Sequence, residues 1–156
     1  DLKPGKRLFL FATGTGLAPF MSLVHDPEMY ESFDKIILMH GVRWKSELAY
    51  QDYLTHSLPN HEFLGDWVRD KLVYYPAVTR ESFIHHGRLT QLIQSGELFE
   101  HIGQMPLDPS TDRAMICGSP AMLEDISAML NHYGFAISAR QGEAGDYVIE
   151  RAFVEK

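Results

Sequence analysis

The chain has 156 residues, of which 45% are hydrophobic and 22% are charged, so its size and composition are those of one ordinary globular domain. Its formal net charge of −7 has the wrong sign for general nucleic-acid binding, which needs a basic surface. No apolar run approaches the ~18 residues that a membrane span requires, and no signal-peptide pattern is recognisable, so neither membrane insertion nor secretion is expected.

The single cysteine, Cys117, excludes an intrachain disulfide and a cysteine-cluster metal site. It predicts a reducing compartment, and therefore a cytoplasmic location. The histidines lack the spacing of metal ligands, so no metal site is expected. Residues 1–6 contain a Pro-Gly turn just before the first apolar run, and we expect them to be a remnant of a linker.

Five short apolar runs predict buried parallel strands, at residues 8–12, 36–39, 72–75, 114–117 and 147–149. The third is expected to stop at Pro76. Helical spacing between the runs predicts a helix at 20–24 that stops at Pro27 and another over about 46–58. Short helices are expected on either side of Gly96, and a longer one runs from the Ser119-Pro120 cap to Gly134. This alternation predicts an α/β fold, a doubly wound five-stranded parallel sheet of the Rossmann-like, nucleotide-binding type.

A glycine turn follows the first predicted strand, in the sequence Thr13-Gly14-Thr15-Gly16-Leu17-Ala18-Pro19. Two glycines allow a tight turn and a close approach of ligand to backbone, and Pro19 suits the first turn of a helix whose free N–H groups attract phosphate. Pro19 replaces the third glycine of a Gly-x-Gly-x-x-Gly fingerprint, and the Gly-Lys-Ser/Thr ending of a P-loop is absent from the sequence. A strand-to-helix turn also needs glycine for purely structural reasons, so the turn alone leaves both interpretations open.

Three of the eight arginines follow predicted strand ends and favour a ligand at that edge of the sheet. Arg43 comes after the second strand, Thr79-Arg80 after the third, and Arg88 eight residues later. A guanidinium offers two parallel donors to a phosphate, and an adenosine 2′-phosphate, which distinguishes NADP from NAD, needs such a cluster. The alternative is that all three are solvated surface arginines.

Cys117-Gly118-Ser119 joins the fourth predicted strand to a helix. The cysteine side chain is expected to point into the binding crevice, and a helix N-terminus lowers a thiol pKa, which suggests a nucleophile. No histidine, aspartate or asparagine stands recognisably beside it in the sequence. A small neutral contact in the crevice, or a buried core cysteine, remains the alternative.

In their order along the chain, these segments resemble the NADP(H)-binding domain of ferredoxin–NADP⁺ reductases of the bacterial branch. The matching segments are 13–20, 40–43, 79–81, 87–90, 117–122 and 152–156. The resemblance implies that residues 7–156 form an NADP-binding domain with a flavin-contacting C-terminal tail, and that a separate FAD-binding barrel lies outside this chain.

The resemblance also implies roles for individual residues. The turn from Gly14 through Thr15 and Gly16 to Pro19 would meet the pyrophosphate, with Thr13 near nicotinamide and flavin. The residues implied for the 2′-phosphate are Arg80 and Arg88, with Thr79 and Arg43 beside them. Those implied for the reacting end are Cys117 beside the nicotinamide, followed by Gly118 and Ser119, and Ala152 and Phe153 against the flavin.

The sequence therefore leaves three functions open. The first is part of an oxidoreductase that exchanges electrons between NADPH and ferredoxin or flavodoxin through FAD, the chain alone being inactive. The second is a stand-alone nucleotide-binding module without redox chemistry. The third is a hydrolase with Cys117 as nucleophile.

Overall fold

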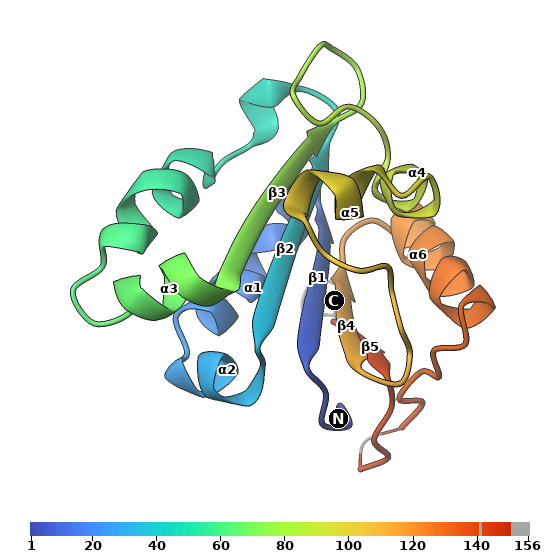
Figure 1. Cartoon of the computed structure of the whole chain (residues 1–156). Coiled ribbons are helices and arrows are strands. Elements are labelled where there is room, and N and C mark those ends of the chain that lie inside the picture. Colours follow the sequence, from blue (N-terminus) through green and yellow to red (C-terminus); the bar gives the residue numbers. More distant parts are fainter. Residues whose placement is uncertain (141, 151–156) are drawn as a thin grey trace, which may run out of the picture.

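The computed structural model describes residues 1–140 and 142–150. Within them, five parallel strands form one sheet in the order β3-β2-β1-β4-β5 (Figure 1). The strands are β1 (Arg7–Thr13), β2 (Lys35–Val42), β3 (Leu72–Val78), β4 (Asp112–Cys117) and β5 (Tyr147–Ile149). The predicted doubly wound α/β fold is confirmed, since the chain moves one way from β1 to β3 and returns to the other side with β4 and β5.

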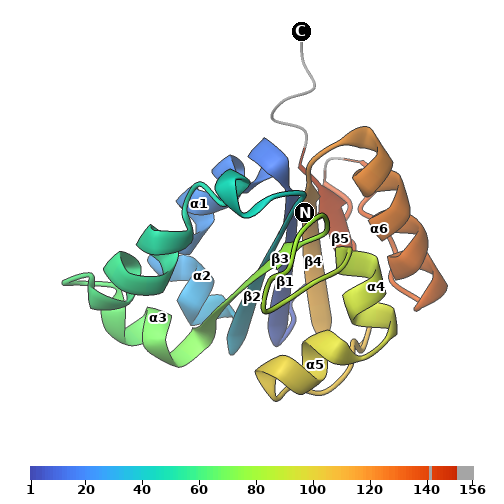
Figure 2. The same ribbon diagram turned by 90° about the horizontal axis from the view of Figure 1, so that it is seen from above.

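Helices cover both faces of this sheet, as the view from above shows (Figure 2). One layer contains α1 (Ala18–Val24), α2 (Pro27–Ser32) and α3 (Gly65–Lys71), and the other contains α4 (Leu89–Gln94), α5 (Glu97–Ile102) and α6 (Pro120–His132). Short 3₁₀ helices and one π-helix, η3, complete the first layer: η1 (Gly14–Leu17), η2 (Lys45–Glu47), η3 (Tyr53–Ser57) and η4 (Leu58–Asn60). Within the described residues, no helix combines the length and the apolar character needed to cross a bilayer.

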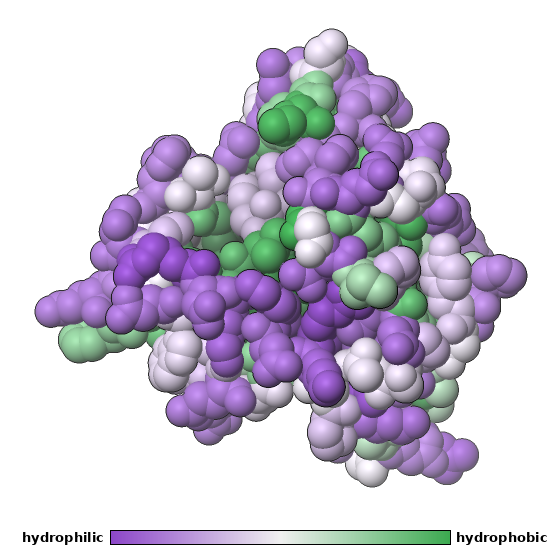
Figure 3. All heavy atoms as spheres, in the orientation of Figure 1, coloured by the Kyte–Doolittle hydropathy of each residue, from purple (hydrophilic) through white to green (hydrophobic). Residues whose placement is uncertain are grey.

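Alternation along the strands divides the core between the two layers. On β1, Phe9 and Phe11 pack with the α4–α6 layer, while Leu8 and Leu10 pack with the α1–α3 layer. Successive side chains of a strand point to opposite faces, so a strand buried on both faces reads as one apolar run. The face of the molecule shown in Figure 3 is mainly hydrophilic, with a hydrophobic area near β3.

The sheet order creates a crevice between β1 and β4. The chain leaves β1 toward the α1–α3 layer and leaves β4 toward α6, so the two following turns separate at this point. Ala12 and Cys117 are register partners at the end of this strand pair. In open α/β sheets, ligands bind outside the carboxyl ends of the strands at such a switch point.

Two expectations about element boundaries are wrong, and two helices were not expected. The helix predicted over 46–58 is divided into η2, the π-helix η3 and η4. The helix predicted at 20–24 does end before Pro27, as α1, but Pro27 itself begins α2, which Asp26 caps by accepting a bond from the Glu28 N–H. The helix α3 likewise follows η4 where no helix was expected. Pro76 lies inside β3, which is tolerated because β3 is an edge strand of the described sheet and lacks a partner strand on its outer side.

Residues 1–6 run beside β4 and β5. Leu2 forms a bridge with Gly145, and the Arg113 guanidinium donates to the carbonyls of Lys3 and Pro4. Their assignment as a linker remnant, and the domain limits 7–156, stay predictions.

Candidate nucleotide-binding site

A hollow of about 760 Å³ lies at the carboxyl ends of β1, β2, β3 and β4. It brings together residues from five separate segments of the sequence. The predicted site residues that line it are Thr13, Gly14, Thr15, Arg43, Thr79, Arg80, Arg88, Gly118 and Ser119. Its volume falls in the range of small-molecule and cofactor sites, roughly 300–1,000 Å³.

The glycine turn forms one wall of the hollow. Gly14 has a φ of +53°, a left-handed conformation that favours glycine, and it begins η1 directly after β1. Pro19 lies in the first turn of α1, as expected. Gly16 is buried and packs directly against the backbone after β4, since an added Cβ would lie 2.6 Å from the carbonyl carbon of Cys117. Gly16 and Pro19 are therefore next to the residues that line the hollow and do not line it themselves.

The arginines form the opposite wall. The Arg80 N–H donates to the carbonyl of Arg43 at 2.9 Å, so the residues after β3 and β2 continue the strand pairing and hold these two arginines side by side. Arg88 reaches the same hollow from the N-terminus of α4, for which it is the capping residue. The loop between Arg80 and Arg88 is fixed to β3, since the Val78 N–H donates to His85 and the Gly87 N–H to Val78.

Two carboxylates in this wall were not predicted from the sequence. Glu47 accepts a bond from the Arg43 guanidinium at 3.0 Å, and that bond is the main reason why the pKa of Glu47 lies below its usual value. Asp125, on α6, lies 3.8 Å from Arg88. The spacing of Arg43 and Glu47, four residues apart, could have indicated the first pair. No local pattern connects Arg88 with Asp125.

Thr13 and Ser119 meet where β1 and β4 end. The Ser119 N–H lies 3.4 Å from the Thr13 hydroxyl oxygen, and the Ser119 hydroxyl caps α6 by accepting from the Met122 N–H. Gly118 lies between them with little room for a side chain, because an added Cβ would press on the Thr13 hydroxyl oxygen and lie 3.2 Å from the Thr13 backbone nitrogen. The predicted Ser-Pro start of this helix is confirmed.

Cys117 has an orientation that differs from the one expected. Its side chain is 1% exposed and packs in the cluster that contains Ala12 and Leu17, so it does not line the hollow formed by the described residues. Burial raises the pKa of the thiol, and the nearby Glu150 raises it further. A raised pKa keeps the thiol protonated, which opposes a nucleophilic role.

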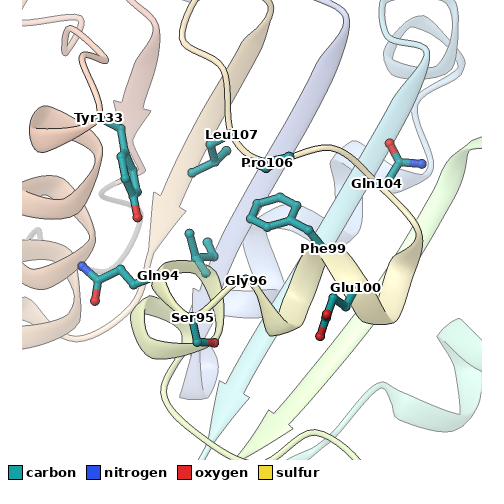
Figure 4. Close-up of a pocket in the computed structure, with 10 residues that line it drawn as sticks. Gln94, Ser95, Gly96, Phe99, Glu100, Gln104, Pro106, Leu107 and Tyr133 are labelled. Atoms are coloured by element: carbon teal, nitrogen blue, oxygen red, sulfur yellow. The ribbon is translucent and has the colours of Figure 1, made fainter.

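The remaining predicted site residues, Ala152 and Phe153, lie outside the described residues. Among residues 1–140 and 142–150, no group of three or more His, Cys, Asp and Glu side chains is arranged to hold a metal ion. A second hollow, of about 450 Å³, lies between α4, α5, the loop before β4 and the end of α6, with Phe99, Leu107 and Tyr133 in its walls (Figure 4). It contains none of the predicted site residues.

The family to which this chain is similar is one that binds a nucleotide of the kind expected at this site. Residues 10–128 match the family model described as oxidoreductase NAD-binding domain, and the chain belongs to that family. The matched region includes the glycine turn, all three arginines and the start of α6.

The similar proteins point to one group within the family. The chain is 62% identical over 156 residues to the ferredoxin–NADP reductase of Pseudomonas aeruginosa and 60% identical to that of Azotobacter vinelandii, covering all of this chain and 60% of each relative. A crystal structure of a ferredoxin NADP⁺ reductase from Neisseria gonorrhoeae with bound FAD and NADP matches with a TM-score of 0.81 and 28% identity, over 96% of this chain and 57% of that one. The resemblance found from the motifs is confirmed, and the chain spans about three-fifths of the length of these relatives.

Proposed function

We propose that this chain is the NADP(H)-binding domain of a ferredoxin–NADP⁺ reductase. In the complete enzyme, electrons would pass between NADPH and ferredoxin or flavodoxin through FAD bound mainly by a separate domain. The family, the similarity to reductases of that name, and the fact that they are longer than this chain support the proposal.

The observation that carries the proposal is the convergence of Arg43, Arg80 and Arg88 on the hollow that also contains the glycine turn. Planar guanidiniums match the oxygens of a phosphate monoester. The 2′-phosphate of the adenosine, a third phosphate distant from the pyrophosphate, is the feature that separates NADP(H) from NAD(H). We therefore assign Arg80 and Arg88, with Thr79 and Arg43, to the adenosine 2′-phosphate.

The other residues of the site fit the rest of the dinucleotide. The turn from Gly14 to Pro19 would hold the pyrophosphate, since its first residues, Gly14 and Thr15, line the hollow without bulky side chains. Thr13, Gly118 and Ser119 would contact the nicotinamide end. Cys117, with its protonated thiol directly behind them, would shape that end as a small neutral group.

The reaction requires a flavin because a hydride carries two electrons, whereas ferredoxin and flavodoxin take one at a time. This chain would bind and orient the nucleotide, and Ala152 and Phe153 would lie against the flavin in the complete enzyme. The chain by itself is expected to bind nucleotide without sustained turnover. The cytoplasmic location stays a prediction from cysteine usage.

The test is a comparison of 2′-phospho-AMP with 5′-AMP by calorimetry. Because a charge-assisted contact contributes ~1.5–3 kcal/mol, Arg80→Ala should weaken 2′-phospho-AMP about tenfold or more and leave 5′-AMP nearly unchanged. Arg140→Ala removes an exposed arginine outside the hollow and is the matched control. Equal losses for both ligands in Arg80→Ala, or no binding of 2′-phospho-AMP to the unmodified chain, would contradict the proposal.

The hydrolase alternative is not supported by a comparable observation. Its nucleophile would be a buried thiol whose pKa is raised. A stand-alone binding module would have the same hollow, and flavin-dependent turnover of the complete protein would distinguish the reductase from it.

A further inference from the structure

A buried histidine lies beneath the glycine turn, outside the set of residues assigned so far. His40 is on β2, opposite Ala12 of β1, and its side chain is 1% exposed. It shares a strand face with Leu38, which packs in the α1–α3 layer, and η1 lies over that end of the strand. A polar ring in this place needs an explanation, because buried polar groups are normally fully hydrogen-bonded.

One ring nitrogen of His40 is bonded to the turn. Nε2 lies 2.8 Å from the carbonyl oxygen of Gly14, and since a carbonyl only accepts, Nε2 is the nitrogen that bears the proton. Burial lowers the pKa of His40, so the ring is neutral at pH 7 and Nδ1 is an acceptor. Nδ1 is buried and has no hydrogen-bond partner among the described residues.

This arrangement is unfavourable for stability alone. A leucine in the same position would continue the apolar face of β2 and would leave no ring nitrogen unpaired. The bond to Gly14 is the interaction that the imidazole provides and an apolar side chain could not.

The bond fixes the direction of one backbone donor. The described peptide bonds are all trans, so the C=O of Gly14 and the N–H of Thr15, which belong to one planar peptide group, point in opposite directions. With the carbonyl held toward His40 in the core, the Thr15 N–H points away from the core. Thr15 is exposed and lines the hollow on that outer side.

We infer that His40 is a positioning residue, which holds the Gly14–Thr15 peptide group so that the Thr15 N–H donates to a pyrophosphate oxygen of the bound dinucleotide. The inference rests on the proposed function, since it needs a ligand with phosphate at the turn. Without His40, only the short 3₁₀ helix η1 would restrain this peptide group, and its Gly14 tolerates many backbone conformations. The donor would then have to be ordered on binding, which lowers affinity.

The experiment compares two ligands and two substitutions. NADP⁺ contains the pyrophosphate, whereas adenosine 2′-monophosphate reaches only the arginine wall. His40→Leu removes the donor, and it should weaken NADP⁺ about three- to tenfold while leaving adenosine 2′-monophosphate unchanged. His40→Gln can place an amide N–H near the position of Nε2, and it should recover most of the NADP⁺ affinity. Circular dichroism and thermal midpoints establish that both variants are folded.

A measurement on the unmodified chain keeps the inference testable if His40→Leu does not fold. In a ¹⁵N–¹H titration, the Thr15 amide proton should shift downfield with NADP⁺ and stay in place with adenosine 2′-monophosphate. A Thr15 amide unaffected by NADP⁺, unchanged NADP⁺ affinity in a folded His40→Leu, or equal losses for both ligands would overturn the inference but leave the proposed function standing. If the unmodified chain bound neither ligand, both would fall.

Discussion

Adding one methyl group at Gly16 should disturb the fold and the site together. Gly16 lies in η1 against the turn that follows β4, where an added Cβ would be 2.6 Å from the carbonyl carbon of Cys117 and 2.9 Å from the Cα of Gly118. Both neighbours are backbone atoms, so no side-chain rotation can relieve the contact. Ordinary contact begins near 3.4 Å, and the two turns must separate by at least ~0.8 Å.

The size of the effect follows from this geometry. Overpacking in a well-packed interior costs about 1–3 kcal/mol, and we expect Gly16→Ala in the upper half of that range because backbone must move. For a domain of this size, each kcal/mol lowers the thermal midpoint by about 2–4 °C, so a decrease of roughly 4–12 °C is expected. Separation of the turns also moves Thr15 away from Gly118 across the hollow, and NADP⁺ affinity should fall about tenfold.

Thermal unfolding and calorimetric NADP⁺ titration measure the two effects. Gly96→Ala is the matched control, because Gly96 has a φ of +85° with open space around it and lies outside the hollow. Its left-handed conformation should cost about 1–2 kcal/mol of stability without loss of NADP⁺ affinity. A Gly16→Ala variant with the midpoint and affinity of the unmodified chain would refute the close-packing explanation.

Two further predictions concern stability. Arg7 donates two hydrogen bonds, of 2.8 and 2.6 Å, to the fully buried carboxylate of Asp112. Arg7→Leu leaves that buried charge unpaired, and it should lower the free energy of unfolding in urea by about 3–5 kcal/mol. A smaller decrease than that caused by Asp112→Asn would argue against this explanation. Burial lowers the pKa of both His40 and His85 in the folded chain, so only the unfolded chain takes up these protons near pH 6.5. The unfolding free energy should therefore be complete above about pH 6.5 and decrease as the pH falls toward the folded pKa values, and His85→Gln should make this decrease smaller.

The strands could be predicted from the sequence because a strand buried on both faces is a continuous apolar run, as in β1 and β2. The helix α2 could not, because a proline can end one helix or begin the next, and the sequence around Pro27 does not distinguish the two. Pro76 shows a second reason why an element boundary could not be predicted from the sequence. Whether a proline ends a strand depends on its neighbours in the sheet, and only the fold places β3 at the edge.

The arginine wall could be predicted because the carboxyl ends of parallel strands meet at one edge, which brings Arg43 and Arg80 together. The contact of Asp125 with Arg88 and that of His40 with Gly14 join distant parts of the fold, and no spacing in the sequence encodes them. Cys117 was assigned correctly to the end of a strand, but its side-chain direction depends on which face of β4 it occupies.

The carboxylates beside the arginines have a consequence for how a nucleotide would leave. Arg43 pairs with Glu47 and Arg88 with Asp125, so the three guanidiniums and two carboxylates of the hollow carry one net positive charge. An arriving phosphate would exchange places with the carboxylates, and a departing one would be replaced by them as the ion pairs re-form. After release, the re-formed ion pairs keep the guanidiniums from facing one another without counter-charges, whereas in the bound state the displaced carboxylates repel the phosphate and favour its release. A site of this kind suits a nucleotide that must be released after every reaction rather than kept as a permanent cofactor.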